Sequence, residues 1–123
     1  MELRGTRPQP VLRQHLSMTV TFRDFVFRCQ HHMPSKSGAA SLPHWHTYTV
    51  RFWLTGEPDQ DWLSSEIQKR YSKFHGSNLN TILEGKSSDE DLAEWFLADA
   101  QSFARCNKVT VTNDYQRGAE ASL

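Results

Sequence analysis

Hydrophobic and polar side chains alternate along residues 44–54, His-Trp-His-Thr-Tyr-Thr-Val-Arg-Phe-Trp-Leu, and this alternation predicts a β-strand. Residues i and i+2 of a strand lie side by side, so His44 and His46 would point into the same space. Two imidazoles at this spacing suit one metal ion, but a zinc site needs three or four protein ligands. The pair alone therefore leaves open the alternative of two unrelated surface histidines.

A second alternating stretch, residues 18–31, predicts a long strand with an irregularity. Its hydrophobic side chains fall at even positions before residue 23 and at odd positions after residue 24. This change of phase predicts a β-bulge near Arg23 and Asp24. After the bulge, one face of the strand would carry four residues: Phe25, Phe27, Cys29 and His31.

The loop between these two strands, residues 33–43, consists mostly of small residues with a proline near each end. It is too long for a tight hairpin but can connect two antiparallel strands. If it does, His31 at the end of the first strand meets His44 and His46 at the start of the second. Three imidazoles would then converge, and the usual outcome is a zinc ion with its fourth coordination position open.

Residues 61–74 have the spacing of an amphipathic helix, which Gly76 would end. Residues 74–80 should form a loop, in which His75 is the one titratable side chain and is most simply an exposed residue. The hydrophobic positions of the helix that would face the core are Leu63, Ile67, Tyr71 and Phe74.

A second helix is predicted to begin after Ser88 and to run to about Arg105. Ser88 and Asp91 resemble a capping box, with Asp in place of the usual Glu. Asp89, Glu90 and Asp91 lie where acidic side chains complement the helix dipole, which explains them more simply than catalysis does. The buried face of this helix would carry Leu92, Trp95, Phe96 and Phe103.

Residues 108–112 alternate again and predict a short strand, followed after a turn by a weak final strand within residues 115–123. The order β-β-α-α-β-β predicts an α+β fold, an antiparallel four-stranded sheet with two helices on one face. Residues 1–17 show little periodicity and are expected to be a tail or an edge extension. Residues 18–123 would then form a single domain.

Composition narrows the function classes. The chain has 123 residues and no net charge, which gives no electrostatic case for binding nucleic acid or an anionic membrane. Its two cysteines, Cys29 and Cys106, make no disulfide framework. No stretch approaches the about 20 apolar residues of a membrane span, and the N-terminus has no apolar signal core. A cytoplasmic protein is expected.

Four short motifs occur in order along the chain. They are Phe-Arg-Cys-Gln-His at residues 27–31, His-Trp-His-Thr-Tyr at 44–48, Leu-Asn at 79–80, and Ser-Ser-Asp-Glu-Asp-Leu-Ala-Glu-Trp at 87–95. In the 6-pyruvoyltetrahydropterin synthase family, which includes the 6-carboxytetrahydropterin synthases, the corresponding motifs are Phe-x-Ala-x-His, His-Gly-His-x-Tyr, Leu-Asn and Pro-Thr-x-Glu-x-Leu-Ala-x-Trp. Four ordered matches make the chain resemble this family.

The resemblance implies a tunnelling fold whose subunits join their sheets into a barrel, commonly as a hexamer of two trimers. It implies a zinc ion on His31, His44 and His46, and a pterin- or purine-like substrate at a subunit interface. In the family, a cysteine base aided by an Asp-His pair moves protons, while a carboxylate near the C-terminus grips the pterin ring. The candidate ligand-binding residues of this chain are Ser88, Asp89, Glu90 and Asn113.

Several positions depart from the family pattern. The catalytic cysteine falls on Ala40, which cannot take a proton. The Asp-His pair falls on His75 and Gly76 or, with one insertion, on Phe74 and His75. The pterin-gripping glutamate falls on Asn113, which can hydrogen-bond a ring edge but cannot pair with it as an ion. The metal half of the site is kept, whereas the acid/base half is lost.

These departures favour a zinc-binding homologue that does not run the standard reaction and acts on, or binds, a different pterin- or purine-like ligand. One alternative is an active carbon-oxygen lyase on dihydroneopterin triphosphate, with Cys29 or His75 as its base. Another is a hydrolase that uses zinc-bound hydroxide, with His75, Glu90 or His32 as general base. The remaining alternative is a structural zinc in an assembly protein.

Overall fold

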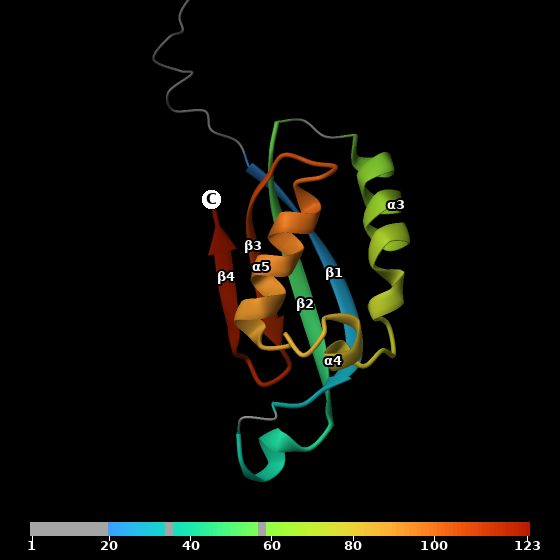
Figure 1. Cartoon of the computed structure of the whole chain (residues 1–123). Helices are drawn as coiled ribbons and strands as arrows, with labels where there is room; N and C mark the ends of the chain where they lie inside the picture. Colours follow the sequence, from blue (N-terminus) through green and yellow to red (C-terminus); the bar gives the residue numbers. More distant parts are fainter. Residues whose placement is uncertain (1–19, 34–35, 57–58) are drawn as a thin grey trace, which may run out of the picture.

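The computed structural model of the chain describes residues 20–33, 36–56 and 59–123 (Figure 1). The predicted tail, residues 1–17, lies outside the described residues. Within them, four strands form one antiparallel sheet in which each strand pairs with its neighbour in sequence. These strands are β1 (Val20–His31), β2 (His44–Thr55), β3 (Cys106–Asn113) and β4 (Gly118–Ser122).

The two main helices lie on one face of this sheet (Figure 1), so the predicted α+β class and the order β-β-α-α-β-β are confirmed. A short helix that was not predicted, α4, begins in the last two residues of the predicted loop 74–80, and the Asn78 side chain caps its start. No helix among the described residues is long and apolar enough to cross a bilayer. The helical elements are η1 (Gly38–Ser41), α3 (Gln60–Tyr71), η2 (Ser72–Phe74), α4 (Leu79–Ile82) and α5 (Asp89–Ala100).

The predicted β-bulge near Arg23 and Asp24 is wrong, because β1 pairs with β2 without interruption along its whole length. Phe22 does not belong to the core face. It is 45% exposed on the other face of the sheet, where its ring lies 5.3 Å from that of Trp53 and 3.9 Å from the Arg51 guanidinium. The change of phase in the sequence therefore reflects hydrophobic side chains on both faces of one regular strand.

The helix boundaries follow local capping chemistry. Asp59 caps α3 by accepting a hydrogen bond from the Trp62 backbone N–H at 3.0 Å. The predicted capping box at Ser88 is confirmed at the start of α5. That helix ends at Ala100 rather than near Arg105, and Phe103 packs against the core from the turn that follows.

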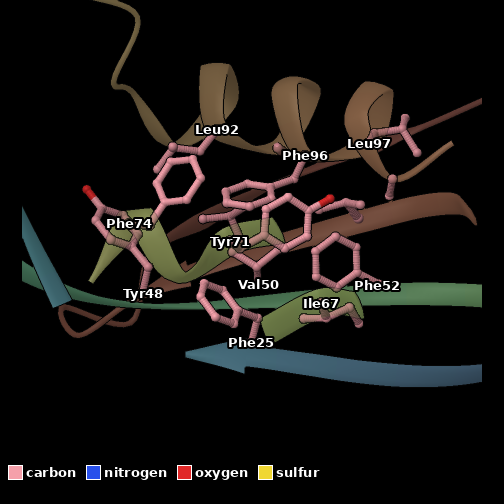
Figure 2. Packing of buried hydrophobic residues seen from close by; sticks show 14 of the residues in the cluster. Phe25, Tyr48, Val50, Phe52, Ile67, Tyr71, Phe74, Leu92, Phe96 and Leu97 are labelled. Atoms are coloured by element: carbon pink, nitrogen blue, oxygen red, sulfur yellow. The ribbon is translucent and has the colours of Figure 1, made fainter. Parts of the chain in front are cut away.

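An aromatic core fills the space between the sheet and the helices, and Figure 2 shows side chains from β1 and β2 facing those from α3 and α5. The rings of Phe52 and Tyr71 stack at 5.6 Å, and Phe96 meets the Phe52 ring edge-on at 5.9 Å. Every second residue of β2 is buried, from Leu54 back to His46 near the start of the strand. The core therefore fixes the strand face on which the histidines lie.

Candidate metal centre

Strand register brings the three predicted metal ligands together. His31 ends β1, His44 begins β2, and the two are direct cross-strand partners. His46 follows on the same face of β2, so the imidazole ring centroids lie 4.6–4.9 Å apart. One ring nitrogen from each residue lies within 4.8 Å of the other two. These histidines could hold a metal ion.

The end of β1 is held in place by the segment before α5. Asn80 is the second residue of the Leu-Asn motif. Its side-chain oxygen accepts a hydrogen bond from the His32 backbone N–H at 2.9 Å, and its amide nitrogen donates one to the His32 carbonyl at 3.0 Å. Gln30 pairs with Asn78 in an isolated parallel bridge. These contacts fix the backbone on both sides of His31, which is itself buried.

Each histidine of the cluster donates its Nδ1 hydrogen to a group that can only accept. The Nδ1 atom of His31 lies 2.9 Å from the Ser87 carbonyl, and that of His44 lies 2.8 Å from the Leu42 carbonyl. The Nδ1 atom of His46 lies 2.7 Å from Asp114 Oδ1. This pattern places the proton of every ring on Nδ1 and leaves each Nε2 lone pair for a metal.

The electrostatics of the cluster agree with that arrangement. Burial is the main effect that lowers the pKa of His31, and the neighbouring His44 and His46 lower it further. The neutral imidazole is the form that binds metals. The hydrogen bond from His46 lowers the pKa of Asp114, so this carboxylate is ionised and acts purely as an acceptor. The three residues thus fit a metal such as zinc.

The cluster opens into a pocket of about 470 Å³. The loop before β2, the first turn of α5 and the turn between β3 and β4 form its walls. All four predicted ligand-binding residues line it, and so does Ala40, the position of the family cysteine. Its lining consists of His31, Met33, Lys36, Ala39, Ala40, His44, His46, Ser88, Asp89, Glu90, Asn113, Tyr115 and Arg117.

The two predicted bases, Cys29 and His75, do not line this pocket. Cys29 is completely buried in the core, where burial raises the pKa of its thiol to about 12. His75 is exposed and its ring packs at 5.1 Å from that of Phe25. Neither is among the described residues that line the pocket.

Sequence reasoning did not single out Asp114, Ser87 or the residues Lys36, Tyr115 and Arg117. Asp114 and Ser87 accept hydrogen bonds from His46 and His31, which lie 68 and 56 residues away in sequence, and no local pattern predicts such contacts. The one available signal was the position of Asp114 beside Asn113. Tertiary structure was needed to show that the carboxylate faces a histidine.

A family model described as 6-pyruvoyl tetrahydropterin synthase matches residues 19–122. The chain belongs to this family. Its fold is similar to the solved structure of 6-pyruvoyl tetrahydropterin synthase from Caenorhabditis elegans, with a TM-score of 0.72 and 18% identity over 86% of this chain and 96% of that one. A search of curated proteins found no match. As a family member, this tetrahydropterin synthase-like protein carries its histidine cluster at the end of the sheet.

Proposed function

We propose that this protein is a zinc-binding member of the 6-pyruvoyl tetrahydropterin synthase family that binds or acts on a pterin- or purine-like ligand without the standard proton-transfer chemistry. The observation that carries the proposal is the combination of three histidines with open Nε2 atoms and Ala40 in the same pocket. The side chains that would hold a metal meet there, whereas the position of the family's proton-transferring cysteine carries only a methyl group.

His31, His44 and His46 would hold the metal. A zinc ion bound there would supply Lewis-acid chemistry, which polarises an oxygen of water or of a ligand. The acceptors behind the three rings hold the Nδ1 hydrogens, so each Nε2 atom is the nitrogen that would face a metal. The protein also buries two of the three rings, since His31 and His46 are 6% and 4% exposed.

The pocket suits a small heterocyclic ligand. Its volume of about 470 Å³ lies within the range of about 300–1,000 Å³ that is usual for small-molecule sites. Ser88, Asp89 and Glu90 present a hydroxyl and two carboxylates at the start of α5. Carboxylates accept hydrogen bonds from ring N–H and amino groups, which pterins and purines both carry. We propose these three residues as ligand contacts.

The lyase alternative needs a base, and the positions of Cys29 and His75 argue against either one acting within its own chain. A thiol inside the core has no route to a ligand. The exposed His75 could act only on the pocket of a neighbouring subunit in the oligomer that the family resemblance implies. A sheet face that leaves Phe22, Val26 and Trp45 at least 40% exposed is consistent with such an assembly.

One observation favours a second candidate function, a metal-dependent hydrolase. Of the three bases proposed for it, Glu90 lines the pocket, whereas His32 and His75 do not. Glu90 would accept a proton from the attacking water. Replacing Glu90 by Gln should abolish hydrolysis while zinc content stays unchanged.

The proposed function is tested by metal analysis of the purified protein together with an assay on dihydroneopterin triphosphate. We expect zinc in the native protein, none in a variant with His44→Ala and His46→Ala, and no tetrahydropterin product. Binding of pterins and purines to the zinc form would be measured by calorimetry. Robust formation of 6-pyruvoyl- or 6-carboxytetrahydropterin would show that the standard reaction survives.

A further inference from the structure

The turn between β3 and β4, residues 114–117, contacts one of the three clustered histidines, His46. Asp114 Oδ1 accepts the Nδ1 hydrogen of His46 at 2.7 Å. The ring of Tyr115 meets the His46 ring edge-on, with 4.7 Å between centroids. His31 and His44 differ, since their Nδ1 atoms donate to backbone carbonyls. His46 is therefore the ligand whose orientation depends on side chains of this turn.

We propose that Asp114 is a positioning residue of the metal centre, holding His46 with its Nε2 atom directed at the metal and making the ring a stronger donor. This inference rests on the proposed function, because it presupposes a metal on the three histidines. Carboxylates behind ligating histidines fix the tautomer and the ring plane, and their loss weakens metal binding by about 10–100-fold. Asp114 supplies the one charged acceptor of the three.

Asn113 builds the turn that presents Asp114. Its side-chain oxygen accepts hydrogen bonds from the backbone N–H groups of Tyr115 at 2.9 Å and Arg117 at 3.4 Å. Its amide nitrogen donates to Asp89 Oδ2 at 3.1 Å, which ties the turn to the first turn of α5. The side chain is 9% exposed, so these internal contacts occupy most of its polar surface.

These contacts give a reason for an amide at the position of the family glutamate. An ionised glutamate at position 113 could not donate a hydrogen bond to Asp89, and it would bring a second carboxylate close to that of Asp89. Asn113→Glu should therefore disturb the turn and release Asp114 from His46. It should weaken zinc binding although it adds a negative charge near a cation, whereas simple electrostatics predicts tighter binding.

The test is the zinc affinity of the full chain, measured at one fixed pH by competition with a chromophoric chelator. We expect Asp114→Ala to weaken binding by about 10–100-fold. Asp114→Asn should lie between this variant and the native protein, since its amide oxygen still accepts a hydrogen bond. Glu120→Ala is the matched control. It removes from the same hairpin a carboxylate that lies 3.9 Å from Lys108 Nζ, and it should not change the affinity.

Two further readouts separate positioning from folding. Cobalt(II) should bind the native protein with the absorption spectrum of a tetrahedral site, and Asp114→Ala should shift those bands as His46 reorients. The metal-free form of Asp114→Ala should still unfold cooperatively, with a loss of stability no larger than that expected for one hydrogen bond, about 1 kcal/mol. If Asp114→Ala does not fold, Asp114→Asn carries the measurement.

The outcomes are distinguishable. Absence of zinc binding in the native protein overturns the proposed function and this inference together. Zinc binding in the native protein with equal affinity in Asp114→Ala overturns this inference alone. Equal losses in Asp114→Ala and Glu120→Ala also overturn it, because the effect would then be general electrostatics. Tighter binding in Asn113→Glu overturns the role assigned to Asn113.

Discussion

At the scale of single residues, burial decides which side chains of this protein can reach a ligand in the pocket. Two residues of β1 separated by one position, Cys29 and His31, share a strand face, yet the thiol is completely buried and the imidazole reaches the pocket. Ala40 reaches the same pocket from the loop before β2. The thiol beside the metal-ligand position His31 is therefore inaccessible, and Ala40, which lines the pocket, has no group that can take a proton.

Thiol labelling checks this assignment. Cys29 and Cys106 are 0% and 2% exposed, so a thiol reagent such as DTNB should label neither in the folded protein and both after unfolding in urea. Ala40→Cys is the matched control, because it places a thiol in the pocket, and it should react in the folded state. Rapid labelling of Cys29 in the native protein would restore it as a candidate base.

Tyr71 connects burial to pH dependence. It is fully buried and donates a hydrogen bond to Asp99 Oδ2 at 2.8 Å; burial first and Asp99 second raise its pKa. In the unfolded chain a tyrosine ionises near about pH 10. Because the pKa of Tyr71 is raised only in the folded state, the protonated tyrosine stabilises the fold fully below about pH 10. This contribution to the free energy of unfolding is lost as the pH rises above about 10 towards the raised pKa.

Tyr71→Phe tests the sign of that effect. At neutral pH the variant should be less stable by about 1 kcal/mol, since one hydrogen bond is lost. Above about pH 10 the native protein should lose stability faster than the variant, so the difference narrows. Urea denaturation of both proteins at neutral pH and above about pH 10 measures this difference in stability. A difference that stays constant or widens at high pH would contradict this account.

At the scale of elements, the start of α5 supports the fold and the site at once. The Ser88 hydroxyl accepts from the Asp91 backbone N–H at 3.0 Å, and Asp91 accepts from the Ser88 backbone N–H at 3.4 Å. The preceding residue, Ser87, offers its carbonyl to His31. The same capped turn places Asp89 and Glu90 on the pocket.

Ser88→Ala should therefore have two effects. Loss of the cap should lower the free energy of unfolding by about 1 kcal/mol, as measured by urea denaturation. It should also weaken ligand binding to the zinc form, because the first turn of α5 frays. Ser65→Ala, an exposed change in the interior of α3, serves as control and should change neither quantity appreciably. An unchanged stability of Ser88→Ala would show that the cap is dispensable.

At the scale of the whole molecule, the core and the histidine cluster are separate parts of the fold. The core consists of hydrophobic side chains packed between the sheet and the helices, and the histidines lie at its edge. The metal-free protein should therefore be folded, unlike a small zinc domain that unfolds without its ion. Zinc should add stability by linkage, since it joins two strands only in the folded chain.

Thermal unfolding with and without zinc measures this coupling. Zinc at a hundredfold excess over its Kd should raise the free energy of unfolding by about 2.7 kcal/mol, and EDTA should reverse the gain. His44 is half-buried and lies outside the core. In the His44→Ala variant, zinc should raise the free energy of unfolding by less than in the native protein. Unfolding or dissociation of the protein when zinc is removed would instead favour a structural zinc in an assembly protein.

Local patterns predicted much of the fold and two of the three clustered histidines, His44 and His46. Alternation predicted β2 and its histidine pair, and capping chemistry predicted the start of α5, because both depend on residues close in sequence. Alternation was misleading in β1, where Phe22 lies on the outer face rather than in the core. A short sequence pattern records spacing, and it does not distinguish a slipped strand from one with hydrophobic side chains on both faces.

By itself the sequence determined the family pattern, the three histidines and the absence of a cysteine at residue 40, since these are matters of residue type and order. Only the tertiary structure decided what surrounds them. It placed Ser87 and Asp114 behind the imidazoles, enclosed Cys29 in the core and kept His75 out of the pocket of its own chain. Hydrogen-bond partners and burial depend on chain segments far apart in sequence, and only packing brings those segments together.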